Sequence, residues 1–358
     1  MTSRRVAIVH PWVVEQRGAE RVFFEIARMW PEADLHVLFH RNGAIPSDLM
    51  PRVRTSFLHK VPVPRHSYRA SLPLLPRAIE SLDLSAYDLV ISSSYGWAHG
   101  AIKRDDAMHV AYMHGPPRYL WGAAAPTRAG RAAQTFLLPL FDRLRTWDRG
   151  AAGRVTTMLA NSRTTAERIC DTYGREASVL FPPVNVEHFM ALDRRPDGSV
   201  VYVGELVPYK RADRVIRACM MLGVPLRIIG DGPERRHLEE IATGADVTFL
   251  GRISDAERDH YLSLASVFAY GGIEDFGIVF VEAMAAGVPI AGIRDGGLAE
   301  IASHGGAAFA DMPSAEGLAD AIECCLSRPA GYADPELSRR FDTSVFRTGL
   351  LDHIEALV

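Results

Sequence analysis

Two carboxylates separated by seven residues form the most informative local pattern in the sequence. Glu274 and Glu282 bound the segment Glu-Asp-Phe-Gly-Ile-Val-Phe-Val-Glu, which follows an apolar run ending at Tyr270. A helix starting near Gly277 would direct its first free N–H groups at a ligand, a ready site for a phosphate. Glu274 would precede this helix, and Glu282 would lie about one and a half turns inside it. Two such carboxylates can hold separate hydroxyls of one extended ligand; alternatively, Glu274 only caps the helix and Glu282 is an ordinary helical acid.

Short apolar runs must position these side chains, and they alternate with longer segments of helical spacing. This alternation is typical of a parallel sheet covered by helices, whose strands are apolar throughout because both faces are buried. We expect strands at residues 5–10, 35–39, 88–92, 109–113 and 155–160, and again at 200–203, 226–229, 247–250, 267–270 and 288–293. Gly271 and Gly272 are expected to form a tight turn after one of the strands.

The length indicates about two domains. A chain of 358 residues is divided at ~100 to 200 residues per domain. Pro182 and Pro183 exclude a helix and mark the boundary between the two series of strands. We therefore predict an α/β protein with two doubly wound, Rossmann-like domains, residues 1–181 and 182–341. Ligands bind outside the carboxyl ends of such strands, so two domains that face each other would form a cleft.

The composition is globular, but the charge is unevenly distributed. Hydrophobic residues make up 48% of the chain, which excludes a disordered or collagen-like protein. Residues 1–180 hold 24 basic against 16 acidic residues and residues 181–358 hold 16 against 27, giving +8 and −11. Basic and apolar residues alternate over 65–79 and 128–154, which favours an anionic membrane surface or a lipid-linked phosphate, with solvated helix faces as the alternative. Nucleic acid is not expected as a partner, because the whole chain is acidic and shows no binding motif.

The sequence also bears on compartment and cofactors. No apolar stretch approaches the ~20 residues that span a bilayer, and the run at residues 6–9 is too short for a signal-peptide core. We expect a cytoplasmic protein, with peripheral attachment at the inner face of the cytoplasmic membrane left open. The four cysteines lack the spacing of a zinc or redox pair, and there is no histidine cluster or aspartate pair for a metal diphosphate. We therefore expect no metal and no other cofactor.

Six segments, in order along the chain, resemble one enzyme family. Residues 274–289 resemble the motif of two glutamates seven residues apart in retaining glycosyltransferases of the GT-B fold, family 4 type, a group that includes bacterial mannosyltransferases of O-antigen and exopolysaccharide assembly. The other segments that resemble its signatures are residues 17–22, 92–100, 112–121, 203–213 and 229–233. The resemblance covers nearly the whole chain. It implies the GT-B fold, with a C-terminal helix, residues 342–358, that crosses back to the N-terminal domain.

The resemblance implies a donor site on the second domain. Glu274 would hold hydroxyls of the donor sugar, Lys210 would neutralise the departing diphosphate, and Glu282 would hold the ribose. The main chain at Phe276, Gly277 and Ile278 would approach the sugar and diphosphate, and that at Gly251, Arg252 and Ile253 would read the base. Many members carry Gly-Arg before the lysine where this chain has Gly204-Glu205, so one diphosphate cation is missing; either Arg211 compensates or Glu205 faces elsewhere.

The resemblance implies further roles in the first domain. His114 follows a strand and would contact the donor sugar near the reacting carbon, although a lone histidine is more often structural. Gly18 would let the backbone approach a phosphate, with Arg17 adding charge, or Gly18 merely starts a helix. The acceptor would meet a cation and two rings, which could instead form a buried aromatic cluster. These acceptor candidates are Arg118, Tyr119 and Trp121.

The activity that the resemblance implies is transfer of a hexose, with retention, from a nucleotide diphosphate donor to an acceptor hydroxyl. Mannose from GDP-mannose is the leading donor, and a lipid-linked saccharide of cell-surface polysaccharide or glycolipid assembly is the leading acceptor. His114, Glu274 and Lys210 are the catalytic candidates, and none is placed as a covalent nucleophile. The alternatives are a soluble transferase acting on a small metabolite, a nucleotide-sugar epimerase of the same fold, and a sugar-binding protein without activity.

Overall fold

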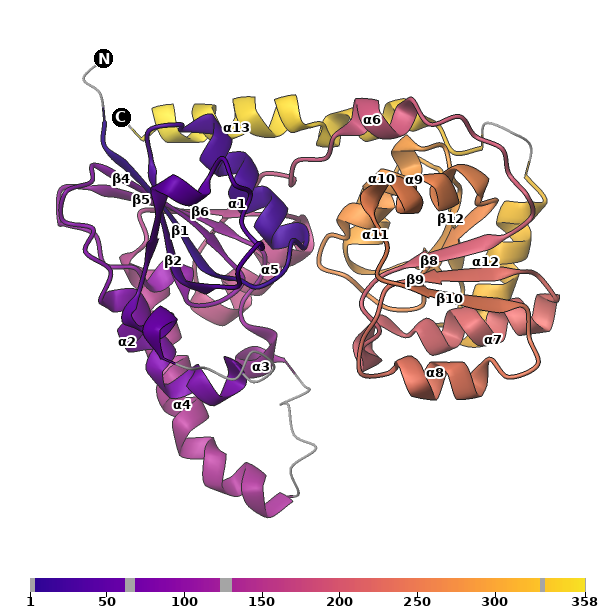
Figure 1. The fold of residues 1–358 in the computed structure, drawn as a ribbon, viewed down its shortest axis with the longest axis horizontal. Coiled ribbons are helices and arrows are strands. Elements are labelled where there is room, and N and C mark those ends of the chain that lie inside the picture. The colour runs from indigo at the N-terminus through magenta and orange to yellow at the C-terminus, as the bar shows by residue number, and fades with distance from the viewer. Residues whose placement is uncertain (1–3, 62–67, 123–130, 329–331, 358) are drawn as a thin grey trace. The chain divides into compact units, whose positions relative to one another are not determined.

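The chain folds into two compact α/β units, described by a computed structural model over residues 4–61, 68–122, 131–328 and 332–357. Unit 1 comprises Met1–Phe181 and Arg347–Val358, and unit 2 comprises Pro182–Phe346. Each unit contains one parallel sheet with helices on both faces (Figure 1). The predicted pair of doubly wound, Rossmann-like domains is therefore confirmed.

Unit 1 is built on a seven-stranded parallel sheet in the order β3-β2-β1-β4-β5-β6-β7. Its strands are β1 (Val6–Val13), β2 (Asp34–His40), β3 (Val53–Thr55), β4 (Leu89–Ser94), β5 (Met108–Met113), β6 (Thr157–Ala160) and β7 (Ser178–Val179). Its α-helices are α1 (Gly18–Met29), α2 (Leu75–Glu80), α3 (Arg118–Trp121), α4 (Arg131–Arg154) and α5 (Arg163–Tyr173). Every residue of β1 and β4 is buried, as expected of central parallel strands. The chain reverses its order between these two strands, which makes their carboxyl ends the expected binding edge.

Unit 2 is built on a six-stranded parallel sheet in the order β10-β9-β8-β11-β12-β13. The strands are β8 (Val200–Val203), β9 (Leu226–Ile229), β10 (Val247–Gly251), β11 (Val267–Ala269), β12 (Ile290–Ile293) and β13 (Ala307–Ala310). The α-helices are α6 (Val186–Met190), α7 (Ala212–Leu222), α8 (Arg235–Ile241), α9 (Asp255–Leu264), α10 (Ile278–Ala285), α11 (Gly296–Ile301) and α12 (Ala315–Leu326). Adjacent β8 and β11 bring the loops that follow them, far apart in sequence, to the same edge.

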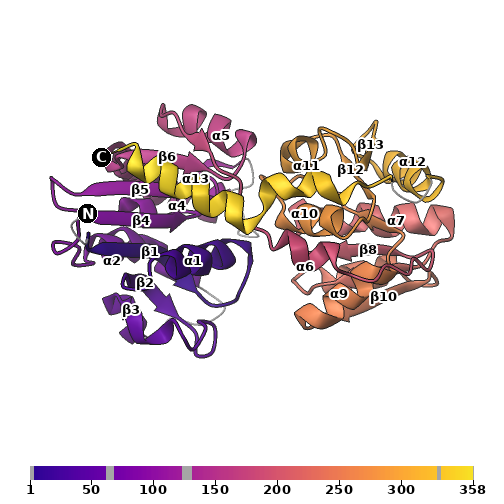
Figure 2. The same ribbon diagram turned by 90° about the horizontal axis from the view of Figure 1, so that it is seen from above.

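The last helix, α13 (Thr343–Glu355), returns the chain to unit 1, as expected from the sequence (Figure 2). Arg347 on this helix donates to Glu25 of α1 at 2.6 Å. The boundary lies slightly later than the predicted residue 342. Residues 342–346 stay in unit 2, because Asp342 pairs with Val184 and the Thr343 N–H donates to the Val184 carbonyl at 3.0 Å. Within the described ranges, no helix combines the length and apolar character needed to cross a bilayer.

Candidate active site

Lys210 and Glu274 meet in unit 2, although 64 positions separate them in the sequence. Lys210 Nζ lies 3.0 Å from Glu274 Oε1, and both side chains are mostly buried. The Tyr270 hydroxyl donates to the same carboxylate oxygen. The Tyr270 ring stacks on the ring of Tyr202, with centroids 5.4 Å apart, and this packing positions the hydroxyl. Glu274 is thus fixed by two donors, and Tyr270 is a member of the site that the sequence analysis missed.

The pairing depends on two loops that approach each other more closely than side chains allow. A Cβ on Gly272 would lie 2.6 Å from the Tyr209 carbonyl oxygen, and one on Gly271 would lie 2.3 Å from that of Arg211. Neither glycine has a positive φ. The tight-turn interpretation of this pair is therefore incomplete, because the glycines serve to admit the lysine loop beside the loop that carries Glu274.

The charge of Lys210 is maintained by two carboxylates. Burial opposes the ammonium, but Glu274, helped by Glu205, outweighs it and raises the pKa of Lys210. Glu205, which stands where many members have arginine, makes the last and smallest of these contributions, and the alternative that it faces elsewhere stays a prediction. Because the carboxylates stabilise the ammonium form, Lys210 is a cation suited to stabilising a leaving group and not to acting as a base.

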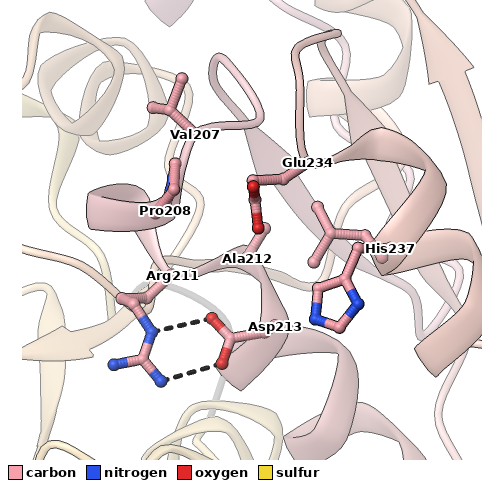
Figure 3. Close-up of a pocket in the computed structure, with 8 residues that line it drawn as sticks. Val207, Pro208, Arg211, Ala212, Asp213, Glu234 and His237 are labelled. Atoms are coloured by element: carbon pink, nitrogen blue, oxygen red, sulfur yellow. Dashed lines mark hydrogen bonds and ion pairs between the residues drawn. The ribbon is translucent and has the colours of Figure 1, made fainter. Parts of the chain in front are cut away.

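Arg211 is paired with an acidic side chain two residues away. Its guanidinium makes two hydrogen bonds of 2.8 Å with Asp213. Both side chains line a small open pocket of about 170 Å³ beside α8 (Figure 3). The other lining residues are Val207, Pro208, Ala212, Glu234, His237 and Leu238. Compensation by Arg211 for the missing arginine stays a prediction.

Helix α10 begins at Ile278, directly after Gly277, close to the expected start. Gly277 occupies the N-cap position with φ of 87°, so Glu274 is not the capping residue. A Cβ at Gly277 would lie 2.4 Å from the Phe280 ring, which favours glycine here twice over. The Phe276 side chain is buried against Phe341, with ring centroids 5.7 Å apart. Only the main chain of Phe276 therefore remains for the ligand contact predicted from the resemblance.

Glu282 lies on α10 and is buried, 3.8 Å from Arg258 Nη1. Burial opposes the charge of Arg258, but Glu282 and Asp259 outweigh it and raise the pKa of the guanidinium. Arg258 also contacts Asp259 at 2.8 Å. The sequence analysis did not identify this arginine, since nothing in the spacing of α9 links it to a carboxylate on another helix. Ribose binding by Glu282 stays a prediction.

Gly230 lies in contact with Gly204 and Gly251 at the carboxyl ends of strands of unit 2. A Cβ on Gly230 would lie 1.9 Å from the Gly204 carbonyl oxygen, and the Gly230 N–H donates to the Gly251 carbonyl at 2.8 Å. Arg252 is exposed and Ile253 half-buried. The carbonyl of Gly251 already accepts a main-chain hydrogen bond, and reading of a base at residues 251–253 stays a prediction.

His114 lies at the carboxyl edge of the sheet in unit 1, directly after β5. Its N–H donates to the Ser94 carbonyl at 2.8 Å, and its Nε2 lies 2.9 Å from Ser93 Oγ. Burial lowers the pKa of His114 to about 3, so the imidazole is neutral near neutral pH. The neighbouring His10 has its Nδ1 3.0 Å from the Ser93 carbonyl, and burial, followed by the charge of His114, lowers the pKa of His10 to about 3. Neither Ser93 nor His10 was identified from the sequence.

The two rings predicted to bind an acceptor lie in an aromatic cluster. Trp121 donates from Nε1 to the fully buried Asp148 at 2.7 Å, and the Arg149 guanidinium lies 4.6 Å from its ring. The Tyr119 ring stacks on the buried Trp97 with centroids 6.1 Å apart. Both residues are half-buried, so packing in the cluster leaves part of each exposed, and acceptor binding by Tyr119 and Trp121 stays a prediction. Arg118 is the first residue of α3 and is half-buried, and its role stays a prediction.

The loop before α1 holds the remaining candidates. Gly18 is the first residue of the helix, which agrees with the simpler of its two interpretations. Arg17 is paired with Glu15 at 2.7 Å, and its N–H donates to Glu20 at 3.1 Å. Close approach of a phosphate to Gly18 stays a prediction.

Two further expectations concern metals and the basic segments. Among the residues that the structure describes, no group of three or more histidine, cysteine, aspartate or glutamate side chains could hold a metal ion. The absence of a metal requirement stays a prediction. Parts of the basic and apolar segments, residues 65–67 and 128–130, lie outside the described residues.

Comparisons with known proteins identify the family. The model of Glycosyltransferase Family 4 matches residues 16–188, and that of Glycosyl transferases group 1 matches residues 191–344. A GDP-mannose-dependent alpha-(1-6)-phosphatidylinositol monomannoside mannosyltransferase of Mycobacterium tuberculosis is 30% identical over 217 residues, 51% of this chain and 56% of that protein. The corresponding dimannoside mannosyltransferase of the same species is 37% identical over 137 residues, 36% of either chain. The chain thus spans about half, or less, of the length of these curated relatives.

Solved structures agree on the fold. Anabaena Alr3699/HepE in complex with UDP-glucose matches with a TM-score of 0.71 and 19% identity, over 98% of this chain and 99% of that one. Sucrose-phosphate synthase from Thermosynechococcus elongatus matches with a TM-score of 0.71 and 17% identity, over 99% of both. With both halves of the chain matched by models of one enzyme class and the whole fold matched by its structures, this protein belongs to the GT-B glycosyltransferases of the family 4 type.

Proposed function

We propose that this protein is a retaining hexosyltransferase that uses a nucleotide diphosphate sugar. The observation that carries the proposal is the cluster of Lys210, Glu274 and Tyr270. Its carboxylate can accept from sugar hydroxyls, and its ammonium lies beside that carboxylate, where a departing diphosphate needs a cation. Mannose from GDP-mannose is the leading donor, because the Mycobacterium tuberculosis relatives are named as GDP-mannose-dependent.

The proposed reaction needs no covalent intermediate with the protein. The bond from the anomeric carbon to the diphosphate oxygen breaks while the acceptor oxygen bonds to the same face of that carbon. Configuration is retained because the acceptor oxygen bonds on the face that the diphosphate leaves. The acceptor proton passes to the leaving phosphate oxygen, so the charges balance. Lys210 would stabilise the developing charge on the diphosphate, and Glu274 would hold the sugar in position. No metal or other cofactor is required in this scheme.

The proposed acceptor is a hydroxyl of a lipid-linked saccharide, used in cell-surface polysaccharide or glycolipid assembly. This part is supported by the names of the mannosyltransferase relatives, which act on phosphatidylinositol mannosides, and by the +8 charge of residues 1–180. An anionic membrane surface at the inner face of the cytoplasmic membrane would then be a further partner. Sedimentation with anionic liposomes at low and high salt tests it; binding that is absent, or indifferent to salt, favours a soluble enzyme acting on a small metabolite.

Substitution in the cluster tests the site. We expect Lys210→Ala and Glu274→Ala each to lower kcat by at least about 100-fold with GDP-mannose or UDP-glucose, as for loss of one preorganised partner of the transition state. Lys103→Ala is the matched control, since the hydrogen bonds of the Lys103 ammonium to described residues are with main-chain carbonyls of its own loop. Rates near those of the unmodified protein in either cluster variant would contradict the assigned roles.

The epimerase alternative is separated by the products. Incubation with donor alone should leave the nucleotide sugar unchanged apart from slow hydrolysis, and transfer should require an acceptor. Conversion of the donor to an epimeric nucleotide sugar without acceptor would replace the proposed function.

A further inference from the structure

Ser93 is a buried hydroxyl near the carboxyl end of β4, whose last three residues are serines, at the expected binding edge of unit 1. Its side chain is fully buried within β4, between β1 and β5. Ser93 Oγ lies 2.9 Å from His114 Nε2, and this is the hydrogen bond that the hydroxyl makes within the described residues. Its main chain is fixed as well, because the Ser93 carbonyl accepts from His10 Nδ1 at 3.0 Å.

Hydrogen-bond accounting fixes the direction of the Ser93–His114 bond. A hydroxyl can donate or accept, but a buried hydroxyl proton without an acceptor is costly. If His114 Nε2 carried the proton, it would donate to Ser93, and no acceptor among the described residues would remain for the serine proton. If Ser93 donates to the lone pair of Nε2, every proton of the pair is used. The imidazole proton then resides on Nδ1.

The other nitrogen of His114 is available to a ligand. His114 is half-buried as a residue, and Nδ1 forms no hydrogen bond with residues that the structure describes. The main-chain N–H of His114 donates to the Ser94 carbonyl at 2.8 Å, so the residue is fixed through its main chain as well as through its ring. Burial, which lowers the pKa of His114 to about 3, keeps the ring neutral and the tautomer well defined.

We infer that Ser93 is a positioning residue that holds His114 as the Nδ1–H tautomer, so that His114 presents a hydrogen-bond donor, and not a base, to an oxygen of the bound substrate. The tautomer follows from the protein alone. Its use on the donor sugar rests on the proposed function. A neutral donor at this point orients a hydroxyl without taking its proton, which leaves proton removal to the departing phosphate.

Nitrogen NMR of the ligand-free protein tests the tautomer directly. In protein labelled with ¹⁵N-histidine, we expect a protonated, pyrrole-type Nδ1 and an unprotonated, pyridine-type Nε2 for His114, identified by the signals missing in His114→Asn. In Ser93→Ala these signals should move toward a mixture of tautomers, and Ser93→Cys, which keeps a weak donor at nearly the same volume, should show a smaller change. A pyrrole-type Nε2 in the unmodified protein, or identical signals in Ser93→Ala, would overturn the inference.

Ser92→Ala provides a matched control for activity. Ser92 is also buried and makes an equivalent bond, with Oγ 2.8 Å from His109 Nε2, on the opposite face of the same strand. We expect Ser93→Ala to lower kcat/KM for the nucleotide sugar about tenfold, the size of one hydrogen bond, and Ser92→Ala to leave it unchanged. Equal losses in the two variants would show a merely structural role and refute positioning. If the NMR signals agree and the unmodified protein transfers no hexose, the proposed function fails while the tautomer assignment stands.

Discussion

Four histidines with strongly lowered pKa values make the stability of unit 1 depend on pH, and His59, whose pKa burial also lowers, acts in the same direction. Burial is the largest cause that lowers the pKa of each, to about 3 in His10, His109 and His114 and to about 4 in His36. An unfolded histidine takes up a proton near pH ~6.5. Between these values the unfolded chain binds more protons than the folded one, so the free energy of unfolding falls as the pH falls below about 6.5.

The expected loss follows from these shifts. Between about pH 7.5 and about pH 5, each histidine lowers the free energy of unfolding by about 2 kcal/mol, or about 8 kcal/mol for the four. Glu20 acts in the opposite direction, because burial raises its pKa to about 7 and the folded chain keeps a proton that the unfolded chain loses near pH 4.5. Glu20 therefore raises the free energy of unfolding by about 2 kcal/mol over the same interval. The net loss of about 6 kcal/mol is comparable to the whole stability of an ordinary domain, ~5–15 kcal/mol.

Tryptophan fluorescence measures this loss in unit 1 alone. All five tryptophans lie in that unit: Trp12, Trp30, Trp97, Trp121 and Trp147. Urea unfolding is followed at both pH values for the unmodified protein and for the double variant Ser92→Ala, His109→Leu, which removes one titrating group together with its partner. The difference in unfolding free energy between the two pH values should shrink by about 2 kcal/mol in the variant, whatever its absolute stability. An unchanged difference would refute the reasoning.

The unit 2 cluster yields two further predictions. Tyr270→Phe keeps the stacking on Tyr202 and removes the hydroxyl that fixes Glu274, so it should raise KM for the donor about tenfold or more, with little change in unfolding midpoint; an unchanged KM would exclude this role. Glu205→Gln removes one negative charge that acts on Lys210 and should tighten binding of GDP or UDP roughly fivefold by calorimetry, less so at high salt; weaker binding would contradict the electrostatic account.

The pattern of the sequence predicted the apolar strands that contain β-branched residues and missed the short polar strands and the alanine-rich one. Strands β3, β7 and β13 were not expected. The first two are short segments near the sheet edges that contain serine, arginine or threonine, and β13 is built of three alanines and a phenylalanine, which have no β-branched residue to mark a strand. Strand β1 extends to Val13, beyond the predicted residue 10. A proline inside the strand is tolerated because Pro11 lies after the residues of β1 that pair with β4.

Some residues of the candidate site could be predicted from the sequence, but the contacts between its side chains could not. Glu274 and Lys210 were identified through the resemblance, and the parallel pairing of β8 with β11 explains why they meet. Tyr270 was read only as the end of an apolar strand, because a tyrosine there satisfies the hydrophobic pattern equally well. Arg258 and Ser93 act through residues on neighbouring elements, and contacts between elements leave no periodicity in the sequence.

The charges in unit 2 explain how an acidic half of the chain could bind an anionic donor. Lys210 is paired with Glu274 and Arg211 with Asp213, so neither cation is without a carboxylate partner before a diphosphate binds. A sugar whose hydroxyls engage Glu274 would draw that carboxylate away from the ammonium and leave Lys210 to the phosphate. In the proposed reaction, the nucleotide sugar would be held through both partners of the pair, whereas the diphosphate left after transfer would compete with a restored Lys210–Glu274 contact and would be released more readily.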